Sequence, residues 1–212
     1  TYQALKTSWG QLSAGARAET VEVASFEAIG PQSENAAQTQ KFKPHSFALG
    51  AMRNLREGEA QDGWQFTTNL SASQRAPKDY ELFAHGMHVA TAAYEIGQPS
   101  NGLEKGTQLD VGGEWKNGPH KWGVTGFVSQ FSNYLALRPT GQGWDGTQLM
   151  TPVGADTPVY RFEGVRARLY GIESTAKLRM VGGQAAWLSP NAAHGAMDLE
   201  LRADVVHAKD LT

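Results

Sequence analysis

The densest group of potential metal ligands lies between residues 76 and 103. His85 and His88 stand three residues apart, so on one helical turn they would face the same way. Neutral imidazole and carboxylate are suitable ligands for Zn²⁺. The carboxylates of this segment are those of Asp79, Glu81 and Glu95. We take His85, His88 and Glu81 as the candidate metal ligands. The alternative is that the His-Gly-x-His element only fixes the conformation of a loop.

The sequence contains no motif typical of an enzyme active site. The sequence holds no G-x-S-x-G, H-E-x-x-H, Walker or dinucleotide-binding motif. Asp198 and Glu200 fall on one face of a predicted strand, as the carboxylates of glycosidases do, but simple alternation explains this. We therefore expect no enzyme, no catalytic residues and no required cofactor. The isolated histidines are interpreted as structural: His45, His120, His194 and His207.

The amino-acid composition excludes several classes of protein and of binding site. The chain has 212 residues, a formal net charge of −2, 24 glycines and no cysteine. The charge gives no electrostatic case for nucleic-acid binding, and the lack of cysteine excludes disulfides and thiolate metal sites. No stretch approaches the roughly 18 consecutive apolar residues of a membrane-spanning helix.

Apolar and polar residues alternate along seven stretches, which is the period of a strand with one apolar face. In the last of them Met197, Leu199 and Leu201 alternate with Asp198 and Glu200. We predict strands over residues 11–21, 47–53, 64–74, 107–115, 121–137, 170–180 and 197–205. Most exceed the 5 or 6 residues, roughly, that are usual in soluble sheets, and a transmembrane strand needs about 9 to 11. Charged polar faces suit a large barrel, where they meet a wet lumen while the apolar faces meet lipid.

The predicted connections alternate between long and short. The long ones cover residues 25–45, 76–103 and 138–158; the short ones cover 57–62 and 116–119. Outer-membrane barrels have long loops on one side and short turns on the other. Five of the six tryptophans fall at the short-turn end, as an interface girdle would: Trp9, Trp64, Trp115, Trp122 and Trp187.

Three parts of the chain carry motifs that occur in a fixed order. Residues 71–91 read SASQRAPKDYELFAHGMHVAT, with an Arg-x-Pro turn followed by His-Gly-x-His-x-Ala-Thr. The further elements are Tyr94–Gly97 (YEIG), Leu103–Gly106 (LEKG), Phe131–Tyr134 (FSNY) and Tyr170–Glu173 (YGIE). Together these motifs resemble those of TonB-dependent outer-membrane receptors, and most nearly the ZnuD-like zinc receptors.

This resemblance implies an antiparallel transmembrane barrel of 22 strands, plugged by an N-terminal domain. It implies uptake of a metal ion or metal complex across the outer membrane, with zinc favoured and haem or an iron chelate as other cargoes. The implied partners are outer-membrane lipid, the metal ligand and, through the plug, the TonB complex; nucleic acid is not among them. Seven strands are about a third of such a barrel, so we expect residues 1–212 to form a partial barrel domain without plug or C-terminal closing strand.

One alternative from another class stays open. A soluble, β-rich binding module with an internal ligand pocket would also show alternating strands. Strand length, the tryptophan distribution and the motifs favour the receptor. If the chain is part of a barrel, it has two unpaired edge strands, and we expect it either to self-associate edge to edge or to close in a non-native way.

Overall fold

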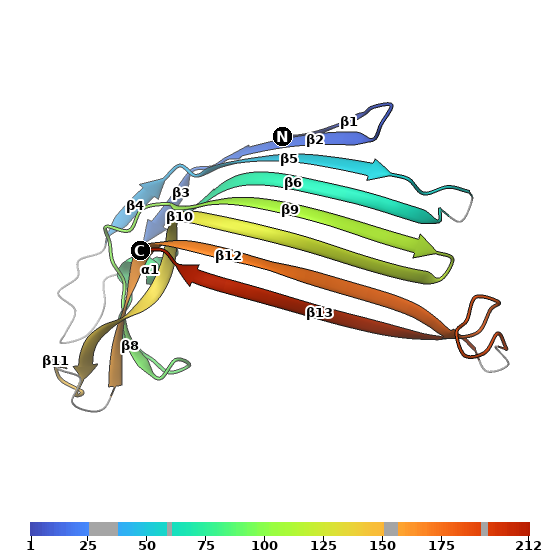
Figure 1. Ribbon diagram of the computed structural model, residues 1–212. Coiled ribbons are helices and arrows are strands. Elements are labelled where there is room, and N and C mark those ends of the chain that lie inside the picture. The colour runs from blue at the N-terminus through green and yellow to red at the C-terminus, as the bar shows by residue number, and fades with distance from the viewer. Residues whose placement is uncertain (26–37, 59–60, 151–156, 192–194) are drawn as a thin grey trace.

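The computed structural model describes residues 1–25, 38–58, 61–150, 157–191 and 195–212. Eight strands form the curved wall in Figure 1: β1 (Tyr2–Lys6), β2 (Gln11–Ala18), β5 (His45–Asn54), β6 (Gly63–Arg75), β9 (Glu104–Asn117), β10 (His120–Trp144), β12 (Thr157–Val181) and β13 (Met197–Asp210). The smaller elements are β3 (Val21–Ala24), β4 (Thr39–Phe42), α1 (Asp79–Phe83), β7 (His85–His88), β8 (Ala93–Ile96) and β11 (Leu149–Met150). The predicted all-β class is confirmed.

The wall is one antiparallel sheet in the order β1-β2-β5-β6-β9-β10-β12, with β13 pairing along β12. Within the described residues the sheet does not close on itself. Strands β1 and β13 form the two edges of the wall, and β8 and β7 continue the sheet from the long-loop end of β12. Each of the seven predicted strands corresponds to a wall strand. The prediction missed β1, because Tyr2–Lys6 do not alternate, and it ran the first strand to residue 21, whereas β2 ends at Ala18.

Strands β10 and β12 are much longer than predicted, at 25 residues each. At about 3.3 Å per residue each spans roughly 80 Å, far more than the roughly 30 Å hydrocarbon core of a bilayer. Their extra length lies at the long-loop end, because the other end of β10 is fixed by the turn at Gly118 and Pro119. Register shifts between Phe131 and Tyr134 and between Pro139 and Gly143 accompany this extension.

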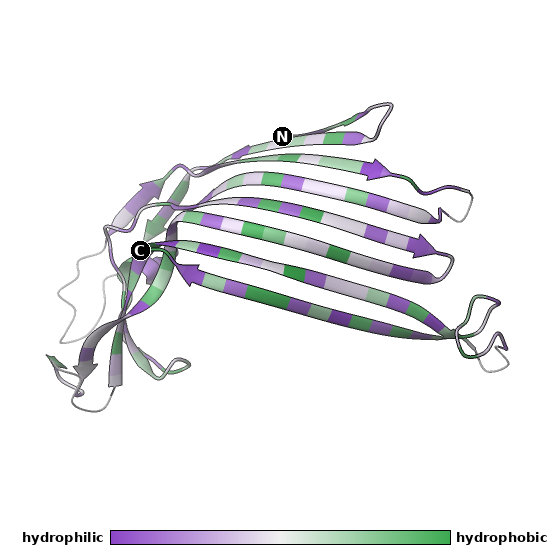
Figure 2. Cartoon of the chain, in the orientation of Figure 1, coloured by the Kyte–Doolittle hydropathy of each residue, from purple (hydrophilic) through white to green (hydrophobic). Residues whose placement is uncertain are grey.

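The pairing register sorts the wall into an apolar face and a polar face. One cross-strand row joins Leu49, Leu70, Leu109, Val128 and Tyr170, and the alternating colours of Figure 2 show the same pattern along each strand. By this alternation every acidic residue of the eight wall strands falls on the polar face: Glu104, Asp110, Glu114, Glu163, Glu173, Asp198, Glu200, Asp204 and Asp210.

The tryptophans gather where the sequence predicted. Trp64 pairs with Trp115, which pairs with Trp122, and the rings of Trp64 and Trp122 meet edge to face at 6.1 Å. Trp9 lies in the turn between β1 and β2, and Trp187 in the link between β12 and β13, both at the same end of the sheet. A row of aromatic rings at this level is typical of a membrane–water interface.

Buried apolar residues are concentrated at the long-loop end, in residues 82–94 and in the long-loop parts of β10 and β12. They are Leu82, Ala93, Tyr94, Leu135, Val159, Phe162, Val165 and Ala167. The apolar face of the wall is exposed instead, with Leu49 and Ile172 each 59% accessible. Within the described part of the chain, no helix has the length and apolar character needed to cross a membrane.

Candidate functional site

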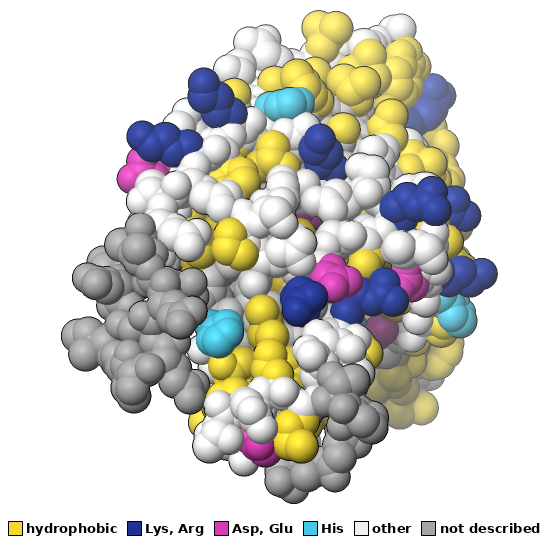
Figure 3. Space-filling view, turned by 90° about the vertical axis from the view of Figure 1, so that its left-hand side faces the viewer, with side chains coloured by type: hydrophobic (Ala, Val, Ile, Leu, Met, Phe, Trp, Pro, Cys, Tyr) yellow, Lys and Arg dark blue, Asp and Glu magenta, His cyan; other side chains and the backbone are white. Residues whose placement is uncertain are grey.

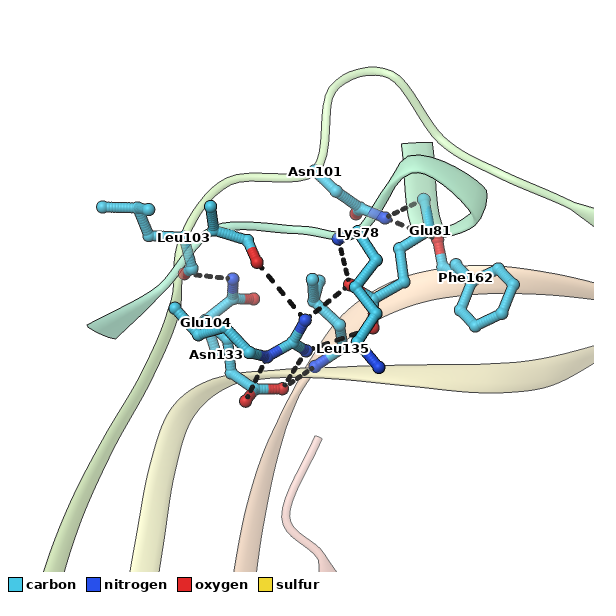
Figure 4. A network of polar contacts seen from close by, with 10 residues as sticks. Lys78, Glu81, Asn101, Leu103, Glu104, Asn133, Leu135 and Phe162 are labelled. Atoms are coloured by element: carbon cyan, nitrogen blue, oxygen red, sulfur yellow. Dashed lines mark hydrogen bonds and ion pairs between the residues drawn. The ribbon is translucent and has the colours of Figure 1, made fainter. Parts of the chain in front are cut away.

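A network around Arg75 fixes the start of the cap, the segment of residues 76–103 that carries α1, β7 and β8 (Figure 4). The guanidinium donates to both oxygens of Glu81, at 2.8 and 3.1 Å. It also donates to both oxygens of Glu104, at 3.1 and 3.0 Å. Arg75 ends β6, Glu81 lies in α1 and Glu104 begins β9. One side chain therefore ties the cap to two wall strands on the polar face.

The local sequence explains why the chain leaves the wall here. Pro77 has no N–H to donate to a ladder, and β6 ends at Arg75, as the Arg-x-Pro motif predicted. The backbone N–H of Lys78 donates to Glu81 at 2.7 Å, which caps the first turn of α1. The Glu81 side chain is only 6% exposed, so it depends on these donors, because a buried carboxylate without partners is costly.

A second set of contacts holds the far end of the cap. Asn101 donates from Nδ2 to the carbonyl of Phe162 on β12 at 3.0 Å and to the carbonyl of Glu81 at 3.2 Å. The N–H of Gly97 donates to the carbonyl of Ala84 at 2.6 Å. A Cβ at Gly97 would lie 2.5 Å from the backbone carbonyl carbon of Leu82, so only glycine allows this approach.

The hairpin of β7 and β8 extends the sheet beyond the wall. Strand β8 pairs in parallel with residues 159–161 of β12, while β13 pairs with residues 167–181 of the same strand. Residues 85–88 form strand β7, not the helical turn on which His85 and His88 would face the same way. Pairing with β8 and, through it, with β12 fixes the extended conformation.

His85 lies in an aromatic cluster. Its Nδ1 is 3.1 Å from the hydroxyl of Tyr94, and the Tyr94 ring lies 4.5 Å from that of Trp144 on β10. Burial raises the pKa of Tyr94 above its ordinary value. A tyrosine hydroxyl is protonated at neutral pH even at its ordinary pKa, so it is available as a hydrogen-bond partner for the imidazole.

His88 belongs to a separate polar triad. Its Nδ1 is 3.0 Å from Oε1 of Glu95, and the hydroxyl of Thr91 donates to the same oxygen at 2.8 Å. The Glu95 side chain is 9% exposed, whereas that of His88 is 56% exposed. The triad ties the tip of the hairpin together and leaves one edge of the imidazole toward solvent.

The structure does not bring the three candidate metal ligands into one group. A spacing of three residues places His85 and His88 on opposite faces of a strand, and Glu81 is held by Arg75. Among the described residues, no three histidine or acidic side chains gather in a way that could hold a metal ion. Metal contact by His85, His88 or Glu81 stays a prediction.

Sequence reasoning missed the residues that organise the cap. It treated Arg75 only as the end of a strand and did not single out Glu104 or Asn101. The signal was present in part, since Arg75 and Lys78 are the only cations between residues 71 and 104, and Glu81 is one of few acids there. What the sequence could not show was that strand pairing returns Glu104 to Arg75, 29 residues away.

The fold and the loop arrangement define a membrane-barrel wall with a structured cap at one end. The chain belongs to the TonB dependent receptor-like β-barrel family, whose model matches residues 2–205. The receptor family predicted from the motifs is confirmed.

Two solved structures share the fold. The copper transporter OprC is 16% identical with a TM-score of 0.61, and the match covers 97% of this chain and 26% of that one. The siderophore receptor PirA from Pseudomonas aeruginosa is 13% identical with a TM-score of 0.52, and the match covers 99% of this chain and 38% of that one. The chain thus spans well under half the length of either protein.

Proposed function

We propose that the chain forms part of the wall and outer loops of an outer-membrane receptor that takes up a metal ion or metal complex and is not an enzyme. The observation that carries this proposal is the division of the wall. Its apolar face is exposed and free of acidic residues, a tryptophan row marks one end, and the cap is anchored on the polar face at the other. In such a receptor the polar face borders the lumen, and energy reaches it from the TonB complex through a plug.

A detergent experiment tests the membrane placement. Water cannot cover the exposed apolar row without a large hydrophobic cost, and the edge strands β1 and β13 offer unpaired backbone groups. We expect the chain to stay dispersed in detergent and to self-associate in plain buffer, as measured by light scattering. A monomer in plain buffer that does not bind a hydrophobic dye would favour a soluble binding module instead.

For the cargo we propose zinc, with haem and an iron chelate as the other candidates. The two structural relatives are a copper transporter and a siderophore receptor, which supports a metal-linked cargo. The exposed edge of His88, or the imidazole of His85 on the opposite face of β7, would supply a nitrogen ligand. Glu81 could serve as a further ligand only if its pair with Arg75 opens.

Zinc titration of histidine variants tests this assignment. We expect the affinity of the detergent-dispersed chain for Zn²⁺ to fall about tenfold or more in His85→Ala plus His88→Ala, measured by calorimetry, since each lost ligand removes a coordinate bond. His207→Ala is the matched control, because His207 stacks on Tyr170 of the wall. Unchanged affinity in the double variant would remove both histidines from the site.

A further inference from the structure

An open hollow of about 310 Å³ lies across five wall strands at the long-loop end. We call it the rim cavity. Strands β5, β6, β9, β10 and β12 all contribute to its lining. The lining residues that matter here are His45, Phe47, Gln74, Lys105, Gln130 and Arg166.

The register places these side chains on the apolar face of the wall. Phe47 alternates with Leu49 along β5, and Gln74 and Lys105 pair with each other in line with Leu70 and Leu109. On β12, Arg166 is four residues from Tyr170, so both side chains lie on the same, apolar face. The rim cavity therefore begins where the apolar rows end. If acyl chains cover those rows, the cavity lies at headgroup level in the leaflet on the loop side.

The charges at the rim cavity are of one sign. Its lining contains Lys105 and Arg166 but no acidic residue, and Arg168 lies on the same face. Within the described parts of the chain, none of these three cations forms an ion pair with a carboxylate. Arg166 donates to the carbonyl of Leu211 and Arg168 to the side chain of Gln130. Both guanidinium groups retain further donors.

Three cations of the polar face are paired, unlike those of the rim cavity. Arg75, Lys177 and Arg179 each pair with carboxylates, because all the acidic residues of the wall strands lie on that face. Uncompensated cations on the acid-free face, beside an exposed apolar surface, fit a ligand that is anionic at one end and apolar at the other. Figure 3 views the molecule from this end, where Lys and Arg side chains of both faces are visible, some beside Asp or Glu and others among hydrophobic side chains.

We propose that the rim cavity binds the phosphate group of a membrane lipid, with Lys105 and Arg166 as its cationic partners. Their strands are separated only by β10, so two strand spacings, about 10 Å, lie between their backbones. Both side chains are long enough to reach one phosphate from opposite sides, and the arginine fork suits phosphate oxygens. His45 and Gln74, whose side-chain nitrogens lie 3.2 Å apart, add polar groups. Phe47 and Thr107 lie where the first part of an acyl chain would pass.

Native mass spectrometry of the chain in non-ionic detergent tests this proposal, with dioleoyl phosphatidic acid as the probe. We expect Lys105→Ala plus Arg166→Ala to weaken lipid binding about tenfold or more, which corresponds to about 1.4 kcal/mol. The charge-preserving pair Lys105→Arg plus Arg166→Lys should retain most of the binding, which separates a charge effect from misfolding. Lys121→Ala plus Arg202→Ala, which removes the same charge from the polar face, is the matched control and should bind as the unmodified chain does.

Two further probes identify the ligand class. Dioleoylglycerol, which lacks phosphate, should not be retained, and inorganic phosphate should not compete at equal concentration. The proposal would be overturned if the rim and control variants lost lipid binding equally, if dioleoylglycerol were retained, or if inorganic phosphate competed fully.

The proposal rests on the membrane placement above. A chain that needs detergent but binds no phosphatidic acid would contradict the rim cavity alone, whereas a detergent-free monomer would contradict the membrane placement.

Discussion

At the scale of single residues, Arg75 holds the cap in position against the wall strands β6 and β9. It neutralises two carboxylates, and Glu81 in particular has little access to water. The arrangement makes the cap depend on one guanidinium, because without it each carboxylate would stay desolvated and would lose its charged partner, keeping a backbone N–H donor from Lys78 or Leu135. Such a dependence is stronger than that of an exposed surface pair.

Replacing Arg75 tests this dependence. We expect Arg75→Ala to lower the local stability of the cap by about 2 kcal/mol, less than a fully buried pair would lose because Arg75 is 37% exposed. Hydrogen exchange of the amides in residues 78–101 would measure the loss. Lys41→Ala, which breaks an exposed pair with Glu22, is the control and should change these rates little. Equal protection in both variants would show that Arg75 does not hold the cap.

At the scale of elements, α1 and the β7–β8 hairpin are held against each other by a close backbone approach. Gly97 passes so near Leu82 and Phe83 that a methyl group has no room. We expect Gly97→Ala to cost about 1 to 3 kcal/mol through overpacking and to increase protease cleavage within residues 84–98. Gly102→Ala is the matched control, because a Cβ there meets no atom within 4 Å. A cap that stays resistant in Gly97→Ala would contradict this account.

Among the elements, most of the wall strands could be predicted from the sequence and the structure of the cap could not. Seven of the eight wall strands were predictable, though not the full length of β10 and β12, because a two-residue period is present in the local sequence, as in Met197–Asp210. The cap was not, because its structure depends on partners far along the chain. Strand β7 forms on a hairpin that is anchored by β12, and Asn101 acts through a carbonyl 61 residues away. The three candidate metal ligands were chosen because potential ligands are frequent in this segment. In the structure each of them belongs to a different contact group.

At the scale of the whole molecule, the two faces of the wall should respond differently to the same charge. We expect Leu109→Arg to reduce the free energy of unfolding in a bilayer by about 2 to 4 kcal/mol, the usual cost of a lipid-facing arginine near the midplane. Gln108→Arg, one residue away on the polar face, should cost much less. Urea titration in lipid vesicles would measure both, and similar losses would contradict the assignment of the faces.

Strand β12 pairs with β13 along one part of its edge and with β8 of the hairpin along another, and this arrangement has a mechanical consequence. The hairpin is joined to β12 through three residue pairs, whereas β13 is joined to the same strand along most of its length. A force that lifts the hairpin away from the sheet would open those pairs one after another, while a force directed along β12 would load all three together. The three pairs should therefore give way more easily when the hairpin is peeled from the sheet than when it is pulled along β12.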